Sequence, residues 1–196
     1  MIEKIERIKE KLSLLKKLDK NYKVFGSENH KYKLNKRKTE QELIAYEKEY
    51  SITLPKEYRS FLKNIGNGGV GPYYGLEPLE NGRFSDLDYK RKDDLINLTQ
   101  PFLHTTPWNF IEITAENEEE YFENKWINGL LRISNFGCGV SINLVVYGAE
   151  HGNLWVDDRC NDQGIFPETY SDKNERIQFL DWYEAWLDKE LKMLFQ

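Results

Sequence analysis

The chain has few of the residues that build disulfide frameworks or zinc sites. Among its 196 residues are only two cysteines and three histidines. Cys138 and Cys160 form no C-x-x-C pair, and His30, His104 and His151 are isolated along the sequence. This scarcity favours free thiols in a reducing compartment over a disulfide framework or a zinc site. We therefore expect no bound metal and no other cofactor.

Long hydrophobic runs are also missing. No stretch approaches the roughly 18 apolar residues that a membrane-spanning helix needs, and residues 1–20 are too rich in lysine and glutamate for a signal peptide. We therefore expect a cytoplasmic protein that does not associate with membranes. The length and the 39% hydrophobic content fit one globular domain with a short appendage.

Positive charge is scarce outside the first part of the chain. Residues 1–38 carry 13 lysines and arginines against 5 acidic residues, whereas residues 39–196 carry 15 against 28. The net charges of the two parts are therefore +8 and −13, within a total of −5. An acidic body is repelled by nucleic acid and attracts basic surfaces. We expect a basic protein partner and no nucleic acid.

Residues 1–38 are predicted to form a basic helix and a connector. Apolar residues recur at three- and four-residue steps from Ile2 to Leu18, which predicts an amphipathic helix with a basic back. Its apolar stripe is expected to pack on the rest of the protein. The lysine-rich residues 21–38 have little periodicity and indicate a connector. The main domain is then predicted to span residues 39–196.

Two further helices are predicted before a glycine-rich segment. Thr39 and Glu42 form a capping-box pattern, which predicts a helix through Tyr50. Pro55 suits the first position of the next helix, and an apolar stripe continues from there to Ile65.

The glycines that follow have the G-x-G-x-x-G spacing of a dinucleotide-binding loop, at Gly66, Gly68 and Gly71. Such a loop needs a strand before it and a helix after it, because the helix N-terminus holds the phosphates. Here a helix precedes the glycines and an extended segment follows. We therefore interpret them as a chain reversal, with positive φ in at least one of Gly66, Gly68 and Gly69. No phosphate or other small-molecule ligand is expected.

The second half of the chain indicates a sheet. Thr114 is expected to begin a helix that ends at Trp126, and Tyr73 or Tyr74 is expected to begin the first strand. Alternating apolar residues then predict three short strands, Leu130–Phe136, Ser141–Tyr147 and Asn153–Val156. Their short, glycine-containing connections favour antiparallel pairing.

The chain closes with an apolar stripe from Leu180 to Leu194, which predicts a helix that covers the sheet. The order of elements is helices, then mostly strands, then a helix, without β-α-β alternation. We therefore predict an α+β fold, with a largely antiparallel central sheet packed by N-terminal and C-terminal helices.

Two groups of residues raise the question of catalysis. Asp157 and Asp158 could form an acid–base pair, but adjacent residues of a strand face opposite ways, which favours a solvated strand end. Cys138, His151 and Asp157 include the residue types of a cysteine hydrolase. Nothing in the sequence places them within reach of one another, and a cysteine between two glycines indicates a tight turn.

Residues 52–76, ITLPKEYRSFLKNIGNGGVGPYYGL, contain a Leu-Pro-x-x-Tyr/Phe-x-x-Phe-Leu helix, followed by Asn-Gly-Gly and an extended Gly-Leu segment. This combination resembles the signature of the SUKH superfamily. Further motifs follow in the family's order: Trp126, Gly129-Leu130-Leu131-x-Ile133, Gly137-Cys138-Gly139, Leu144-Val145-Val146-x-Gly148 and Gly152-x-Leu154-Trp155. The resemblance covers roughly residues 39–191 and leaves residues 1–38 outside.

The resemblance implies an α+β fold and no catalytic residues, because the family has no established catalytic set. Its bacterial members are widely interpreted as immunity proteins of polymorphic or contact-dependent toxin systems, and a fungal branch regulates cell-wall glucan synthesis and signalling. The recurrent motif residues are interpreted as determinants of the fold: Leu54, Pro55, Tyr58, Phe61, Asn67, Gly68, Gly69 and Trp155.

These observations lead to a functional hypothesis. We expect a non-enzymatic protein-binding domain, an immunity protein that neutralises a cognate toxin, often a nuclease with a basic site. The alternative is a regulator or scaffold in cell-wall glucan synthesis and signalling. The candidate partner contacts are acidic residues and possible aromatic anchors: Tyr73, Tyr74, Glu116, Glu118, Glu119, Glu120, Asp157 and Asp158. The glutamates among them also suit the first turns of a helix.

Overall fold

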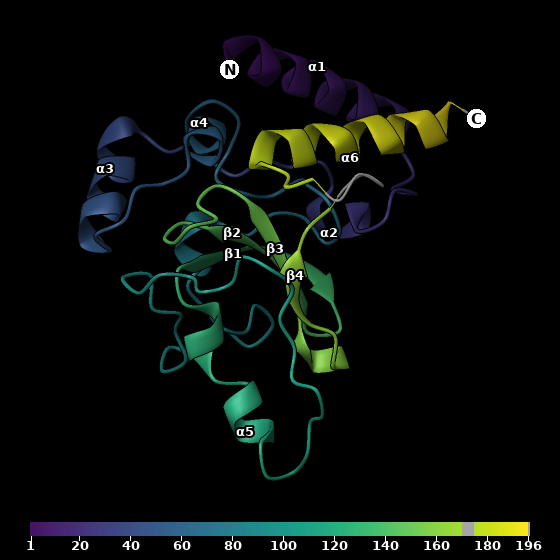
Figure 1. Ribbon diagram of the computed structural model, residues 1–196. Coiled ribbons are helices and arrows are strands. Elements are labelled where there is room, and N and C mark those ends of the chain that lie inside the picture. The colour runs from purple at the N-terminus through teal and green to yellow at the C-terminus, as the bar shows by residue number, and fades with distance from the viewer. Residues whose placement is uncertain (170–174, 196) are drawn as a thin grey trace.

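A computed structural model describes residues 1–169 and 175–195. Its elements form an α+β fold in which two long helices lie across one end of an antiparallel sheet (Figure 1). Within the described ranges, no helix combines the length and the apolar character needed to cross a membrane.

The sheet is an antiparallel meander with strand order β1-β2-β3-β4. Its strands are β1 (Leu130–Gly137), β2 (Val140–Val145), β3 (Leu154–Asp158) and β4 (Gly164–Pro167). The three strands predicted from alternation are confirmed to within two residues. β4 was missed, because its four residues are too few to show a period and its pairing with β3 is long-range information.

Residues 1–169 and 175–195 contain six α-helices. They are α1 (Ile2–Leu18), α2 (Ser27–His30), α3 (Glu40–Glu49), α4 (Lys56–Asn64), α5 (Glu118–Tyr121) and α6 (Phe179–Leu194). The same ranges contain the 3-10 turns η1 (Leu79–Asn81), η2 (Asn124–Ile127) and η3 (Arg159–Asn161).

The predicted start of α3 is confirmed. Thr39 is its N-cap, the Thr39 hydroxyl accepts from the Glu42 amide at 3.2 Å, and the Glu42 carboxylate accepts from the Thr39 amide at 2.7 Å. The start of α4 was predicted one residue early, because Pro55 is its N-cap and Lys56 its first helical residue.

The segment that contains Gly66, Gly68, Gly69 and Gly71, which we call the glycine loop, reverses the chain, as predicted. Gly68 and Gly69 have φ of 81° and 99°. A Cβ at Gly69 would lie 2.3 Å from the Lys33 carbonyl oxygen, so this backbone crossing requires glycine. Gly69 and Leu76 exchange backbone hydrogen bonds of 2.7 and 2.8 Å, which close the loop.

Two local predictions were wrong. Tyr73 and Tyr74 do not begin a strand, because Tyr73 has φ of 58° within a turn and the extended pairing starts only at Leu76. A continuous helix from Thr114 to Trp126 does not form either. Asn117 bonds the Thr114 amide and the Glu112 carbonyl through its side chain, and this holds a loop where a helix would begin.

α1 packs on the remainder of the protein through its apolar stripe. Its buried residues Ile5, Ile8, Leu12 and Leu15 belong to the single core cluster that also contains α4, α6 and the sheet. α6 lies between α1 and the sheet (Figure 1). The Tyr183 hydroxyl of α6 donates to the Val70 carbonyl at 2.8 Å, which ties this helix to the glycine loop.

Candidate functional site

The four glutamates among the predicted contacts lie on a projection that we call the acidic arm, residues 112–123. α5, at its centre, points away from the layer of α1 and α6 (Figure 1). Glu116, Glu118, Glu119 and Glu120 are all exposed. Within residues 1–169 and 175–195, the first three have no ion-pair partner, whereas Glu120 pairs with Lys125 at 2.9 Å. Three carboxylates are therefore free to meet a basic surface.

An aromatic base supports the acidic arm. Tyr121 is fully buried, stacks on Trp108 with ring centroids 5.6 Å apart, and donates its hydroxyl hydrogen bond to Asn109 at 2.7 Å. Trp108 in turn contacts Trp126 at 4.5 Å. Packed aromatic rings have few accessible rotamers, so the glutamates are carried on a fixed support.

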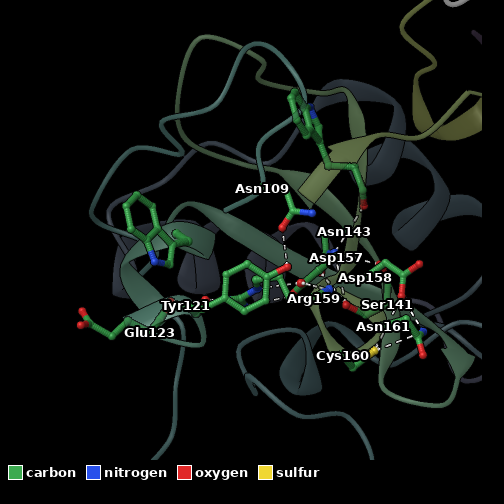
Figure 2. A network of polar contacts seen from close by, with 12 residues as sticks. Asn109, Tyr121, Glu123, Ser141, Asn143, Asp157, Asp158, Arg159, Cys160 and Asn161 are labelled. Carbon is green, nitrogen blue, oxygen red and sulfur yellow. Dashed lines mark hydrogen bonds and ion pairs between the residues drawn. The ribbon is translucent and has the colours of Figure 1, made fainter. Parts of the chain in front are cut away.

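Asp157 lies at the centre of a buried ion-pair triad with Arg132 and Arg159. Its carboxylate receives an Nη2 hydrogen bond from Arg132 at 2.8 Å and two hydrogen bonds from Arg159, at 2.8 and 3.0 Å (Figure 2 draws those from Arg159). Burial raises the pKa of this carboxyl, but the attraction of the two arginines outweighs it and lowers the pKa to about 2. Burial lowers the pKa of the Arg132 guanidinium.

This geometry removes Asp157 from the candidate contact surface. Its side chain is 6% accessible and already paired on both oxygens, so it cannot meet a partner protein as the sequence suggested. Asp158 points elsewhere, as expected for adjacent strand residues, and accepts from the Asn161 side chain at 2.6 Å. Asp158 is partly exposed and remains a candidate contact.

The triad also holds the acidic arm. Arg159 donates through Nη1 to the backbone carbonyls of Tyr121, at 2.9 Å, and of Glu123, at 3.2 Å. The Arg159 guanidinium therefore connects the C-terminal end of β3 to the end of α5. Sequence reasoning missed both arginines. A charged residue inside the apolar strand LLRIS was the available signal, because an arginine there must either reach water or be paired.

The triad lies on a polar face of the sheet that the rest of the chain covers. Arg132, Ser141, Asn143 and Asp157 share this face, because cross-strand partners point to the same side. A bulge between Arg132 and Ser134 shifts the register beside them. All four residues are at most 5% exposed. The sequence predicted a solvated strand end at Asp157, because alternation cannot report which segments from elsewhere in the chain cover a face.

A polar cleft of about 470 Å³ opens between this face and two covering segments. Residues 85–94 and 122–124 form its outer wall, and the triad forms its floor. The outer wall carries carboxylates of Asp86, Asp88, Asp94 and Glu123. We call this site the polar cleft.

The predicted aromatic anchors occupy a different surface, which we call the aromatic patch: Phe25, Tyr73, Tyr74 and Phe136. Tyr74 is 42% exposed and contacts Phe25 with centroids 5.1 Å apart. Tyr73 is half-buried and packs on Phe136 at 4.4 Å. Phe25, Tyr73 and Phe136 also line a hollow of about 360 Å³. Exposed aromatic rings beside a hollow suit the anchoring of a protein partner.

The residues of a cysteine hydrolase are engaged separately. His151 bonds the Thr53 carbonyl at 2.8 Å through Nε2, and both oxygens of Asp157 are held by arginines. Cys138 has φ of 52° in the tight turn between β1 and β2, and its carbonyl accepts from the Cys160 thiol at 3.0 Å. No base or orienting group for Cys138 is present among these contacts. Across the described ranges, no group of three potential ligands could hold a metal ion.

Comparison with known proteins identifies one family. The model of the SMI1 / KNR4 family (SUKH-1) matches residues 38–188, which include the glycine loop, the sheet, the acidic arm and most of α6. α1 precedes the matched region. No curated protein and no solved structure gives a match.

Proposed function

Because the chain belongs to the SMI1 / KNR4 family (SUKH-1), which generally comprises non-enzymatic binding domains, we propose that it is an immunity protein that binds and neutralises a cognate protein toxin. The toxin is a protein with a basic functional surface, such as a nuclease, and the complex forms in the cytoplasm. The chain contributes binding alone and carries out no reaction of its own.

The observation that carries this proposal is the acidic arm. Glu116, Glu118 and Glu119 project from a buried aromatic base and have no cation beside them within the described part of the chain. Holding like charges together costs stability unless a partner neutralises them. A nuclease must be basic where it holds phosphate, so such a surface complements the arm and would be occluded by it.

The aromatic patch supplies the second half of the proposed interface. Charged contacts set the rate of encounter, whereas aromatic side chains that enter a pocket slow the dissociation of a complex. Tyr74 is one of the exposed rings of this patch, together with Phe25 and Phe136, and Tyr73 packs on Phe136 from a half-buried position. Asp158 is a further candidate for the acidic contacts.

Co-expression with the product of the neighbouring open reading frame tests this function. The proposal predicts that this product is a toxin, that the two proteins co-purify, and that the chain abolishes the toxicity. The same chain with Glu116, Glu118 and Glu119 changed to lysine should protect less well. A stable complex with a component of cell-wall synthesis in cells without any toxin would contradict the proposal and favour the regulator.

A further inference from the structure

The floor of the polar cleft carries more positive charge than its buried partners neutralise. Arg132 and Arg159 share the single carboxylate of Asp157, and all three side chains are at most 6% accessible. The remaining positive charge lies where water screens it poorly, and Asp86 of the outer wall is a further carboxylate that attracts Arg132. A buried charge without a directly bonded partner of its own is costly, so it marks a position where an anion gains stability by binding.

The hydrogen bonds of the two arginines identify which one is incomplete. Arg159 donates from Nε, Nη1 and Nη2, to Asp157 and to two backbone carbonyls. Within residues 1–169 and 175–195, Arg132 donates only to Ser141, from Nη1, and to Asp157, from Nη2. Its Nε is buried without any acceptor among the described residues. Arg132 lines the cleft, so it is the donor that a ligand can satisfy.

The outer wall determines what kind of anion fits. Asp86, Asp88, Asp94 and Glu123 line it, with Arg91 as the only cation apart from the floor arginines. The carboxylates of this wall would repel a phosphate dianion. A singly charged carboxylate flanked by cations would instead meet opposite charge twice, because its negative charge faces the floor arginines and its flanking cations face the wall. Guanidinium and carboxylate also match as planar, bidentate partners.

We propose that the polar cleft binds a carboxylate flanked by lysine or arginine on a basic protein segment, with the carboxylate on Arg132 and the flanking cations on the outer wall. The volume of about 470 Å³ accommodates one such side chain with its neighbours. The inference rests on the proposed function, since it describes how the basic partner is anchored. Arg159 bonds the acidic arm as well as the triad, so binding at the floor and contact at the arm involve connected residues.

Titration of the whole protein with short peptides, observed by NMR at the arginine Nε–Hε signals, tests the site without the toxin. Acetyl-Lys-Glu-Lys-amide is expected to shift the Arg132 signal in a saturable way, and acetyl-Lys-Gln-Lys-amide is not. A Lys-Lys peptide with a free C-terminus shows whether a chain terminus can replace the side-chain carboxylate. Inorganic phosphate is expected to bind more weakly than the glutamate peptide.

Arg83 is the internal control. Its Nε is also buried without an acceptor in the described part of the chain. The Arg83 guanidinium lies over the Tyr50 ring, with Cζ 4.2 Å from the centroid, and outside the cleft. Arg132→Lys keeps the charge but loses the planar donor pair, and should weaken the glutamate peptide by about tenfold or more. Arg83→Lys should leave its affinity unchanged.

The site would be overturned by an unshifted Arg132 signal, by equal shifts with the glutamine peptide, or by tighter binding of phosphate. These wild-type measurements stand even if Arg132→Lys does not fold. Failure of the two proposals is distinguishable. A toxin complex that forms without peptide binding contradicts the cleft alone, whereas peptide binding by a chain that protects against no toxin contradicts the immunity function alone.

Discussion

The layer of α1 and α6 and the acidic arm use charged residues in opposite ways. In the layer, Arg7 and Lys11 of α1 both pair with Glu184 of α6 at 2.9 Å, and Lys11 also reaches Asp188 at 2.6 Å. On the arm, four glutamates have no such partner within the described ranges: Glu112, Glu116, Glu118 and Glu119. Basic residues at the start of the chain are therefore partly paired within the protein, whereas most glutamates of the arm are unpaired in the described part of the chain.

The largest loss of stability is expected from a substitution that breaks the buried triad. Asp157→Asn leaves two arginines with no carboxylate, and should lower the free energy of unfolding by about 3–5 kcal/mol, measured by urea denaturation. The matched variant Asp158→Asn, on a partly exposed neighbour, should cost under about 1 kcal/mol. Equal losses would contradict the triad as the source of the effect.

The triad also predicts a dependence on pH. The folded pKa of Asp157, about 2, lies below the ordinary aspartate value. Its contribution is therefore present above the ordinary value of roughly 4 and is lost as the pH falls toward the folded value. The difference in free energy of unfolding between wild type and Asp157→Asn should be constant above about pH 5 and narrow below it. A constant difference down to the acid transition would contradict the low pKa.

The next largest loss of stability is expected when the apolar contact of α1 is reduced. Ile8 is fully buried, so Ile8→Ala should lower the free energy of unfolding by about 2–4 kcal/mol. Ile2, on the same helix, is 80% exposed, and Ile2→Ala should cost less than about 0.5 kcal/mol. Chemical denaturation compares the two. A small cost at Ile8 would mean that α1, which precedes the family match, is not part of the cooperative fold.

A smaller difference in stability is expected between substitutions of a paired and of an unpaired glutamate. The Glu184 carboxylate is mostly buried, and its hydrogen bonds with Arg7 and Lys11 outweigh the cost of burial and hold its pKa below the usual range. Glu184→Gln should cost about 1–2 kcal/mol. Glu119→Gln should change stability by less than about 0.5 kcal/mol. If both changes cost the same, the layer and the arm would not differ as described.

Local patterns predicted the secondary structure better than they predicted the site. Thr39 and Glu42 sit next to each other in a helix turn, so their capping box follows from four residues of sequence. The triad depends on three residues from two strands and a 3-10 turn, and its burial depends on segments that alternation does not describe. Asp157 was therefore assigned to the surface although it lies beneath the covering segments.

The same distinction explains the aromatic and acidic candidates. Exposure of Glu116 to Glu120 could be predicted, because charged side chains without an apolar stripe stay in water. The turn at Tyr73 could not, since positive φ in a tyrosine is imposed by the surrounding structure rather than by its own preference. Its contact with Phe136 joins residues far apart in the sequence.

The association rate with the toxin from the neighbouring reading frame tests the central claim most directly. Two variants with the same change in net charge are compared at low salt: Glu116, Glu118 and Glu119 to lysine on the arm, and the exposed Glu3, Glu6 and Glu10 to lysine on α1. The arm variant should associate about tenfold more slowly or worse, and the α1 variant much less so. Equal rates for the two variants, or an arm variant as fast as wild type, would contradict the acidic arm as the partner-binding surface.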